Sequence, residues 1–406
     1  FGKKMLTGLI KLLTSNGKFI QLAKDLTSGQ EKRLSILEAA KPLLLISIWK
    51  MLRVPVLVIC PRPEDARHLY DILSSYLGES IPIHHFVGME TLPFERLTPD
   101  TPSISQRLHA MSALSSVHEK QNPAFVVTSA SGLAMRNFSP ELLGEESQVI
   151  RRGDTLSMEV LLNKWIFLGY KVQSIADVPG TLSRRGGILD IFPIDQSIPT
   201  RMEFYGNTID SMRTFDPVSQ LTVDFINKVS VIPARELLTN KKDPKLPLEK
   251  IKGLDFSNLT PSSITLIEEE LDLLSKGYEV KEPGFYAGFY NQNSITDFLP
   301  KEGLIVLDQA SEIEESLDDL DKRITELRET KTKRGDIPEG FPSPYLDKAN
   351  IMHSIRQKPR RLNLSRWGTE DHETLPFEAI ASFRGELANF LTNIRENVRT
   401  GNRVIV

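Results

Sequence analysis

The sequence contains very little cysteine, with Cys60 as the only one among 406 residues. One thiol excludes an intrachain disulfide framework and is typical of a reducing compartment, so we expect a cytoplasmic protein. No apolar run approaches the roughly 20 residues that span a bilayer, and the run 42–48 soon meets Lys50 and Arg53. We also expect no secretory leader. The sequence therefore indicates a protein with no membrane partner and no structural disulfides.

The sequence also lacks a strong net charge. It has 50 lysines and arginines against 53 aspartates and glutamates, which gives −3 at pH 7. This balance produces no overall attraction toward nucleic acid or an acidic membrane. Hydrophobic residues make up 40% and charged residues 25%, the composition of an ordinary globular protein. The chain is too long for one ordinary core, so we expect two to four domains.

Strand and helix patterns alternate through the first 143 residues. The run 54–60 is continuously apolar, which is typical of a strand buried on both faces of a parallel sheet. Residues 64–77 have helical spacing, and 83–86 and 124–128 predict further strands. Because strands alternate with helices, we predict an α/β domain over residues 1–143.

The pattern changes after this point to short alternating strands with frequent turns. Residues 201–205 and 208–215 alternate polar and apolar side chains around a Gly-Asn turn, which predicts a β-hairpin. Residues 158–168 predict a helix beside it. We therefore predict a small inserted α+β domain at 144–216.

Residues 217–344 return to the α/β pattern and form its second segment. An apolar strand that ends in an acid is predicted at 303–308, and a long helix follows at 311–334. We expect 345–374 to be an extended linker and 375–406 to begin a further domain. The chain starts without methionine and stops inside an apparent strand, so we expect a fragment of a longer protein.

The most distinctive stretch is 177–220, which is dense in glycine, proline and arginine. Its residues 180–193 read Gly-Thr-Leu-Ser-Arg-Arg-Gly-Gly-Ile-Leu-Asp-Ile-Phe-Pro, and 201–205 and 213–217 read Arg-Met-Glu-Phe-Tyr and Arg-Thr-Phe-Asp-Pro. These segments resemble the damage-recognition module of the excision-repair protein UvrB. They resemble more closely the same module of the bacterial transcription-repair coupling factor family (Mfd). Supporting similarities occur at 90–94, 286–288, 297–300 and 307–311.

The resemblance covers roughly residues 30–345 and implies a P-loop helicase-like, UvrB-like parallel sheet in two segments around the inserted domain. In that family the module binds UvrA, and the parent's C-terminal motor uses ATP and Mg²⁺ to move on DNA and displace RNA polymerase. The UvrA-binding face also packs against the parent's C-terminal domain. The resemblance thus implies an N-terminal region that recruits UvrA to stalled RNA polymerase for nucleotide excision repair.

An active ATPase of this kind needs a loop that ends in Gly-Lys-Ser/Thr and an Asp-Glu pair after an apolar strand. Where the resemblance places the loop, Lys41 has no neighbouring glycine and Pro42 replaces the Mg²⁺-binding Ser or Thr. After the strand, Asp308 is followed by Gln309, whose carboxamide cannot take a proton from water. Taken alone, Asp308 would be interpreted as a polar strand end. Together the losses imply a degenerate ATPase fold with no cofactor and no catalytic residue in this chain.

No other catalytic or metal-binding pattern competes in the sequence. His84 and His85 are neighbours, and adjacent strand residues point to opposite faces, so they make a poor metal clamp. Cys60 ends a buried strand and is expected to be an inert core thiol. The serines around Gly132 lack the Gly-x-Ser-x-Gly spacing of a nucleophile elbow.

The resemblance carries the UvrA-binding residues over by position. Arg185 and Arg201 match the two family arginines, and Tyr205 occupies a family aromatic position. Arg184 is a further candidate without a counterpart. Arginine and tyrosine dominate interface hot spots, and equal parity along a strand places Arg201 and Tyr205 on one face.

Two alternatives for these arginines follow from charge. Residues 151–220 contain eight basic and eight acidic side chains, so their net charge is zero and an acidic protein patch suits them better than DNA. Alternatively, Arg185 and Arg201 only pair with Asp190 or Glu203 across a hairpin, each pair adding about 0–1 kcal/mol.

Two functions other than UvrA recruitment stay open at this point. A nucleotide-binding repair helicase with a divergent loop would bind ATP through Lys41. A DNA-binding module would use the basic segment 356–361 and show steeply salt-dependent affinity. UvrB's DNA-clamping aromatic hairpin has no counterpart between residues 90 and 124, where Phe94 is the only aromatic residue, so we predict no damage clamping.

Overall fold

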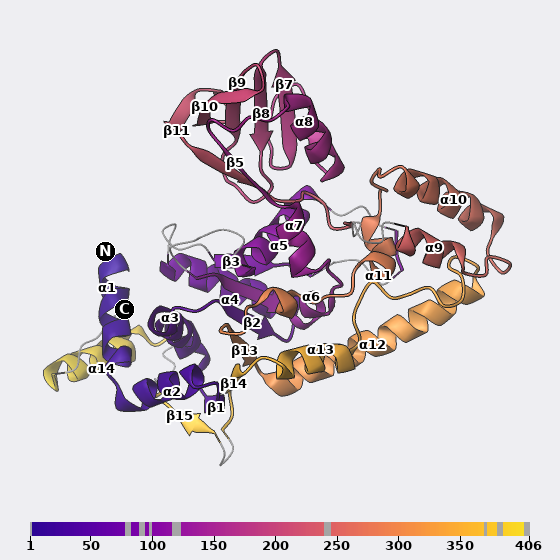
Figure 1. Ribbon diagram of the computed structural model, residues 1–406. Helices are drawn as coiled ribbons and strands as arrows, with labels where there is room; N and C mark the ends of the chain where they lie inside the picture. Colours follow the sequence, from indigo (N-terminus) through magenta and orange to yellow (C-terminus); the bar gives the residue numbers. More distant parts are fainter. Residues whose placement is uncertain are drawn as a thin grey trace.

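The computed structural model describes residues 2–77, 83–88, 94–96, 100–115, 123–238, 245–368, 372–379 and 385–401. Its centre is a parallel sheet of seven strands (Figure 1). In spatial order the strands are β15 (Glu373–Thr374), β1 (Glu31–Ser35), β14 (Arg360–Ser365), β13 (Leu304–Asp308), β2 (Val56–Cys60), β4 (Phe125–Ser129) and β3 (Ile83–Phe86). Every adjacent pair in this sheet runs parallel.

Helices cover both faces of the parallel sheet, as its apolar strands require. Alternation along β2 sends Val56, Val58 and Cys60 into one core and Leu57 and Ile59 into another. The first core is closed by α1 (Gly2–Thr14), α2 (Gly17–Thr27), α3 (Lys41–Leu52) and α4 (Pro63–Leu77). The second is closed mainly by α5 (Thr101–Leu114), α6 (Ala130–Ala134), α12 (Ala310–Lys333) and α13 (Lys348–Arg356). The predicted α/β class with a parallel sheet is confirmed.

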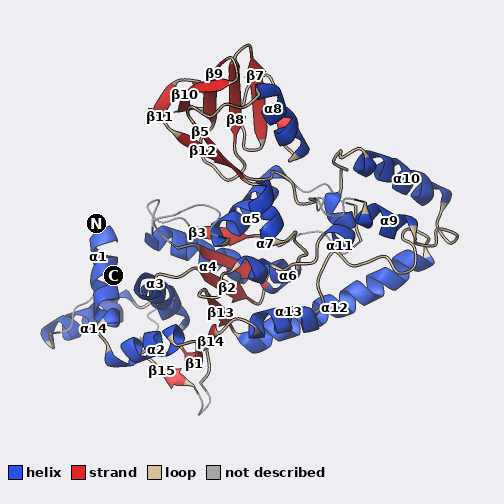
Figure 2. Cartoon of the chain, viewed as in Figure 1, coloured by secondary structure: helices blue, strands red, loops and turns tan. Residues whose placement is uncertain are grey.

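The remaining helices of the α/β part are short or peripheral. They are η1 (Glu38–Ala40), α7 (Pro140–Glu146), α9 (Leu246–Lys252), α10 (Pro261–Ser275), η2 (Pro283–Tyr286), α11 (Ala287–Tyr290), η3 (Ile295–Phe298) and α14 (Leu387–Arg399). Figure 2 shows α9, α10 and α11 grouped to one side of the sheet, above α12 in this view. None of the helices in the described ranges is long and apolar enough to cross a membrane.

The inserted domain forms a separate lobe, drawn at the top of Figure 1. Its main sheet has the order β11 (Thr222–Phe225), β10 (Thr208–Phe215), β9 (Thr200–Tyr205), β8 (Ile188–Phe192), β7 (Thr181–Arg185) and β6 (Lys171–Val172). A second pair joins β5 (Gln148–Arg151) to β12 (Lys228–Val231). The helix α8 (Met158–Phe167) packs its Leu161 and Trp165 into the core of this lobe.

The boundary predicted at residue 216 is too early. Strand β11 pairs with β10, and β12 pairs with β5, so the lobe continues to Val231. The sequence did not reveal these two strands, because they follow the position at which we predicted that the α/β pattern resumes. The lobe is therefore closed by strands that follow the predicted boundary.

The linker predicted at 345–374 is also wrong. Its residues 348–356 form α13, and 360–365 form β14, which lies inside the sheet between β1 and β13. Leu362 and Leu364 are buried, as a central strand requires. The predicted terminal strand at 402–406 and the motif at 90–94, apart from Phe94, lie outside the described residues, as do parts of the segment examined for an aromatic hairpin.

Candidate functional sites

One face of the six-stranded sheet presents polar side chains in register. Ser183, Asp190, Arg201, Arg213 and Phe225 are successive cross-strand partners, so their side chains share this face. The opposite face is apolar and carries Leu182, Leu189, Met202 and Met212 into the core against α8. We call the first face the polar sheet face.

Asp190 is the centre of this face. Its carboxylate is fully buried and accepts from two arginines. Arg201 donates from Nε to Oδ1 at 2.7 Å and from Nη2 to Oδ2 at 2.8 Å. Arg185 donates from Nη2 to the same Oδ2 at 3.0 Å. The alternative that both arginines pair across the hairpin is therefore what the structure shows, with Asp190 as the acceptor.

Further contacts fix Arg201 in place. Its Nη2 also donates to the side-chain oxygen of Gln220 at 3.0 Å, and its guanidinium lies 4.4 Å from the ring centroid of Phe215. Hydrogen bonding to Asp190 raises the pKa of Arg201 in spite of the opposing effect of burial. Glu203 is occupied by other neighbours, since it accepts from Arg213 at 2.7 Å and from Ser211 at 2.6 Å. Arg201 is therefore a positioning residue of the sheet.

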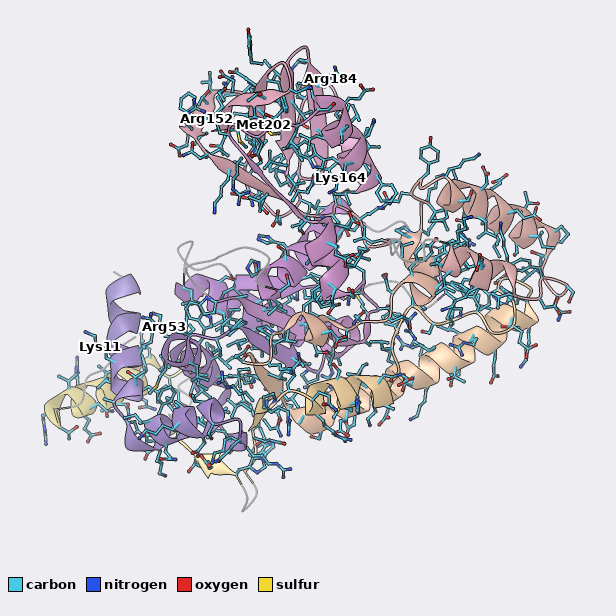
Figure 3. All side chains as sticks on the ribbon, in the orientation of Figure 1. Lys11, Arg53, Arg152, Lys164, Arg184 and Met202 are labelled. Atoms are coloured by element: carbon cyan, nitrogen blue, oxygen red, sulfur yellow. The ribbon has the colours of Figure 1, made fainter. Side chains whose placement is uncertain are left out.

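Exposure separates the predicted binding residues. Tyr205 is 85% exposed, and the side chain of Arg185 is 51% exposed, whereas that of Arg201 is only 13% exposed. Arg184 is also exposed, but its register pairs it with Leu189, so it belongs to the opposite face. Figure 3 labels Arg184 at the margin of this lobe. The structure thus brings Arg185, Arg201 and Tyr205 onto one face and leaves Arg184 outside it.

Sequence reasoning missed an apolar edge next to this face. Val218, Leu221, Val223 and Phe225 are exposed on β11 and the turn before it. Strand β11 is the last strand of its sheet, and all four of its residues are exposed. Exposed edge strands offer unpaired backbone groups to other chains. The alternation Leu-Thr-Val-Asp-Phe at 221–225 could have revealed it, had the domain boundary been placed later.

A second candidate site lies at the carboxyl ends of the parallel strands. A cavity of about 570 Å³ opens there. Its walls come from the β1–α3 connection, the start and outer side of α4, the β13–α12 junction and the residue after β14. In open parallel sheets ligands bind at this edge. The predicted degenerate positions Asp308 and Gln309 both line it.

The lysine predicted to stand at the phosphate position does not reach this cavity. Lys41 is buried, and its Nζ donates to Oδ2 of Asp308 at 2.7 Å and to Oε1 of Glu38 at 2.8 Å. Glu38 in turn pairs with Arg366 at 3.2 Å. The structure brings Lys41, Asp308 and Gln309 together, as the resemblance implies, but directs the lysine to carboxylates of the same chain.

The electrostatics of this group are set by its burial. Burial opposes the charge on Lys41, but the Asp308 and Glu38 carboxylates outweigh it and raise the pKa of the ammonium. Burial also raises the pKa of Asp308, against the attraction of Lys41. Gln309 follows in a left-handed conformation, with φ 62°, and begins α12 without a side-chain cap. Cys60 beside this group is buried, and its thiol pKa is raised by that burial.

The basic segment at 356–361 is used within the fold. Arg361 pairs with Glu31 at 2.6 Å and donates to main-chain carbonyls, and Arg360 and Lys358 donate to carbonyls of Glu302 and Leu299. No group of three or more His, Cys, Asp or Glu side chains suited to a metal occurs in the part of the chain that the structure describes.

A comparison with known protein families finds a match to the inserted lobe. Residues 149–237 match the family described as the UvrB interaction domain. This lobe is similar to a UvrB interaction domain. The match extends past residue 216 and includes β11 and β12, in agreement with the strand pairing.

Curated relatives extend the similarity beyond this domain. The chain is 30% identical to the transcription-repair-coupling factor of Myxococcus xanthus over 310 residues, which is 71% of this chain and 25% of that protein. It is 24% identical to that of Bacillus subtilis over 386 residues, 87% of this chain and 31% of that protein. It is 26% identical to that of Haemophilus influenzae over 273 residues, which is 67% of this chain and 23% of that protein. The predicted resemblance is confirmed, and the chain spans between 23% and 31% of these relatives.

Proposed function

We propose that this chain is the UvrA-docking, N-terminal part of a transcription-repair coupling factor. The proposal is supported by the UvrB interaction domain and by relatives that share that name. The observation that carries it is the polar sheet face, where Tyr205 and half-exposed Arg185 stand above a buried pair of Arg201 and Asp190. An exposed tyrosine and arginine on a rigid support are typical of a protein-binding hot spot.

The contacts of Arg201 and Arg185 within the sheet indicate a different role for each. Arg201 is held by four contacts, to Asp190, Gln220 and the Phe215 ring, and so keeps the carboxylate neutralised. Arg185 makes one contact to that carboxylate and keeps donors free for a partner. We therefore assign direct contact with UvrA to Arg185 and Tyr205, and positioning to Arg201.

We further propose that the chain does not hydrolyse ATP. Hydrolysis needs a lysine on the phosphates and a base for water. Lys41 is committed to Asp308 and Glu38, and Gln309 has no basic oxygen. Any ATP, Mg²⁺, DNA and RNA polymerase would be engaged by other parts of the longer protein, which would act in the cytoplasm, and an intramolecular contact with its C-terminal domain would compete with UvrA.

The test is calorimetric titration of UvrA into the 406-residue chain without DNA. We expect Arg185→Ala/Tyr205→Ala to lose about 2 kcal/mol or more of binding free energy. The matched control is Arg184→Ala/Tyr278→Ala, which removes the same residue types from exposed positions off the polar sheet face. Equal loss in both double variants, or no binding by the unmodified chain, would contradict the proposal.

A further inference from the structure

The cavity at the carboxyl ends of the parallel strands has one apolar wall and one polar wall. Its apolar wall is formed by Pro42, Pro61 and three residues along α4, which are Leu69, Ile72 and Tyr76. Its polar wall holds carboxylates and amides. A volume of about 570 Å³ is large enough for a side chain or a small ligand.

Carboxylates occupy the positions where a phosphate would need positive charge. Asp65 lies in the first turn of α4 and Glu312 in the first turn of α12, and Glu38 begins η1. All three line the cavity. Helix starts attract anions through their free N–H groups, but here side chains of the same sign as phosphate stand at them. The site is therefore unsuited to a phosphate.

The sum of charges favours a cation. Among the residues that the structure describes, four carboxylates and the guanidinium of Arg366 line the cavity. Adding Lys41 beneath Asp308 gives two positive charges against four negative ones, a net charge of −2. A single positive ligand would reduce this imbalance.

A buried carboxylate oxygen points to the kind of ligand. Asp308 is only 5% exposed and lines the cavity. Its Oδ2 accepts from Lys41, but its Oδ1 accepts no hydrogen bond from the residues that the structure describes. A buried acceptor without a donor is unfavourable, so a ligand N–H that reached this oxygen would be favoured.

We propose that the cavity binds a guanidinium group. A guanidinium is a planar cation with five N–H donors, so it can donate to more than one of the carboxylates that line the cavity. It is weakly hydrated, and its aliphatic stem can lie along the apolar wall of α4. The source is either an arginine in a protein segment or a small guanidino compound.

Calorimetry with the 406-residue chain tests this directly. The probes are N-acetyl-arginine amide, its neutral isostere N-acetyl-citrulline amide, the small cation methylguanidinium, and ATP. We expect the arginine amide to bind at least tenfold more tightly than the citrulline amide, and ATP not to compete. Tighter binding of the arginine amide than of methylguanidinium assigns the site to a protein arginine, and the reverse assigns it to a small compound. Equal binding of arginine and citrulline amides, or displacement by ATP, overturns the proposal.

Variants at the rim keep the test independent of folding. Asp65→Asn/Glu312→Gln removes two cavity charges and leaves the buried Lys41–Asp308 pair intact. We expect at least a tenfold loss of arginine-amide affinity. The control Glu64→Gln/Glu315→Gln neutralises two exposed acids on the same helices outside the cavity. Similar affinities for both double variants would contradict the assignment, and UvrA binding should be unchanged in each.

Discussion

Arg201 and Asp190 form a two-pronged ion pair across β9 and β8, with N–O distances of 2.7 and 2.8 Å, and the carboxylate is fully buried. The pair neutralises this buried acid, and Arg185 donates to the same carboxylate from β7. Replacing Arg201 would leave most of this buried charge uncompensated, because Arg185 supplies a single, more exposed contact.

We therefore predict that Arg201→Ala destabilises the lobe by roughly 3 kcal/mol, the cost of breaking a buried pair from one side. Arg185→Ala should cost less than about 1 kcal/mol, as for a partly exposed pair. Urea unfolding measures both when it is followed by tryptophan fluorescence in a Trp49→Phe/Trp367→Phe background, where the signal comes from Trp165, which is buried in this lobe. Equal stabilities would show that Arg185 alone can neutralise Asp190.

The ring of Tyr205 should matter more than its hydroxyl. The side chain is 85% exposed, and its hydroxyl makes no hydrogen bond with the described residues. Binding free energy would therefore come mainly from burying the ring against the bound protein. We predict that Tyr205→Phe keeps UvrA affinity within about twofold and that Tyr205→Ser loses about 2 kcal/mol. Neither should change the unfolding midpoint. A large loss with phenylalanine would assign the contact to a hydroxyl hydrogen bond.

Adding a carboxylate at position 309 should not give the chain ATPase activity. In Gln309→Glu, Lys41 stays bonded to Asp308 and Glu38, and further negative charge would repel nucleotide. We predict no phosphate release above that of the unmodified chain when ATP and Mg²⁺ are added. ATP-dependent release by this variant would show that Lys41 leaves its carboxylates when nucleotide arrives.

Alkaline conditions should weaken the fold through Tyr345. Burial raises the pKa of this tyrosine to about 12, above its usual value of 10. The unfolded chain therefore loses the phenolic proton first, and the stability that the neutral ring provides falls as the pH rises from 10 through 12. Two pH units correspond to about 2–3 kcal/mol. We expect Tyr345→Phe to flatten this fall in urea unfolding measured at successive pH values, and an unchanged slope would contradict the assignment.

Removing the predicted linker should unfold the parallel sheet. A chain ending at residue 344 lacks β14, so β1 and β13 lose the strand between them and the buried Leu362 and Leu364. We predict loss of cooperative unfolding for the α/β part, monitored by circular dichroism, while the lobe at 148–231 keeps UvrA binding. A stable sheet in this truncated chain would show that β1 and β13 can pair directly.

The sequence predicted what local patterns encode. The uninterrupted apolar runs of β2, β4 and β13 predicted a parallel sheet, and the alternation at 201–215 predicted the β-hairpin of the inserted lobe. Strand β14 was missed because Arg360, Arg361 and Asn363 made it look like a basic linker. Those side chains are satisfied by Glu31 and Glu302, which only the folded sheet places beside them.

The sites show the same division between local and distant information. The parity of Arg201 and Tyr205 on one strand was visible in the sequence, and so was Asp190 as an alternative partner. The capture of Lys41 by Asp308 was not, because 267 residues separate the two. The sequence also did not predict which arginine is exposed. Arg201 and Arg185 look equivalent in the sequence, and only in the fold does the turn that carries Gln220 contact Arg201.

The position of β14 also sets an order of events during synthesis. The parallel sheet has an open gap between β1 and β13 until residue 365 has left the ribosome, whereas every strand of the inserted lobe is available once residue 231 has emerged. Domains generally fold as units as the chain grows. The inserted lobe would thus be complete while the parallel sheet beside it is still being made.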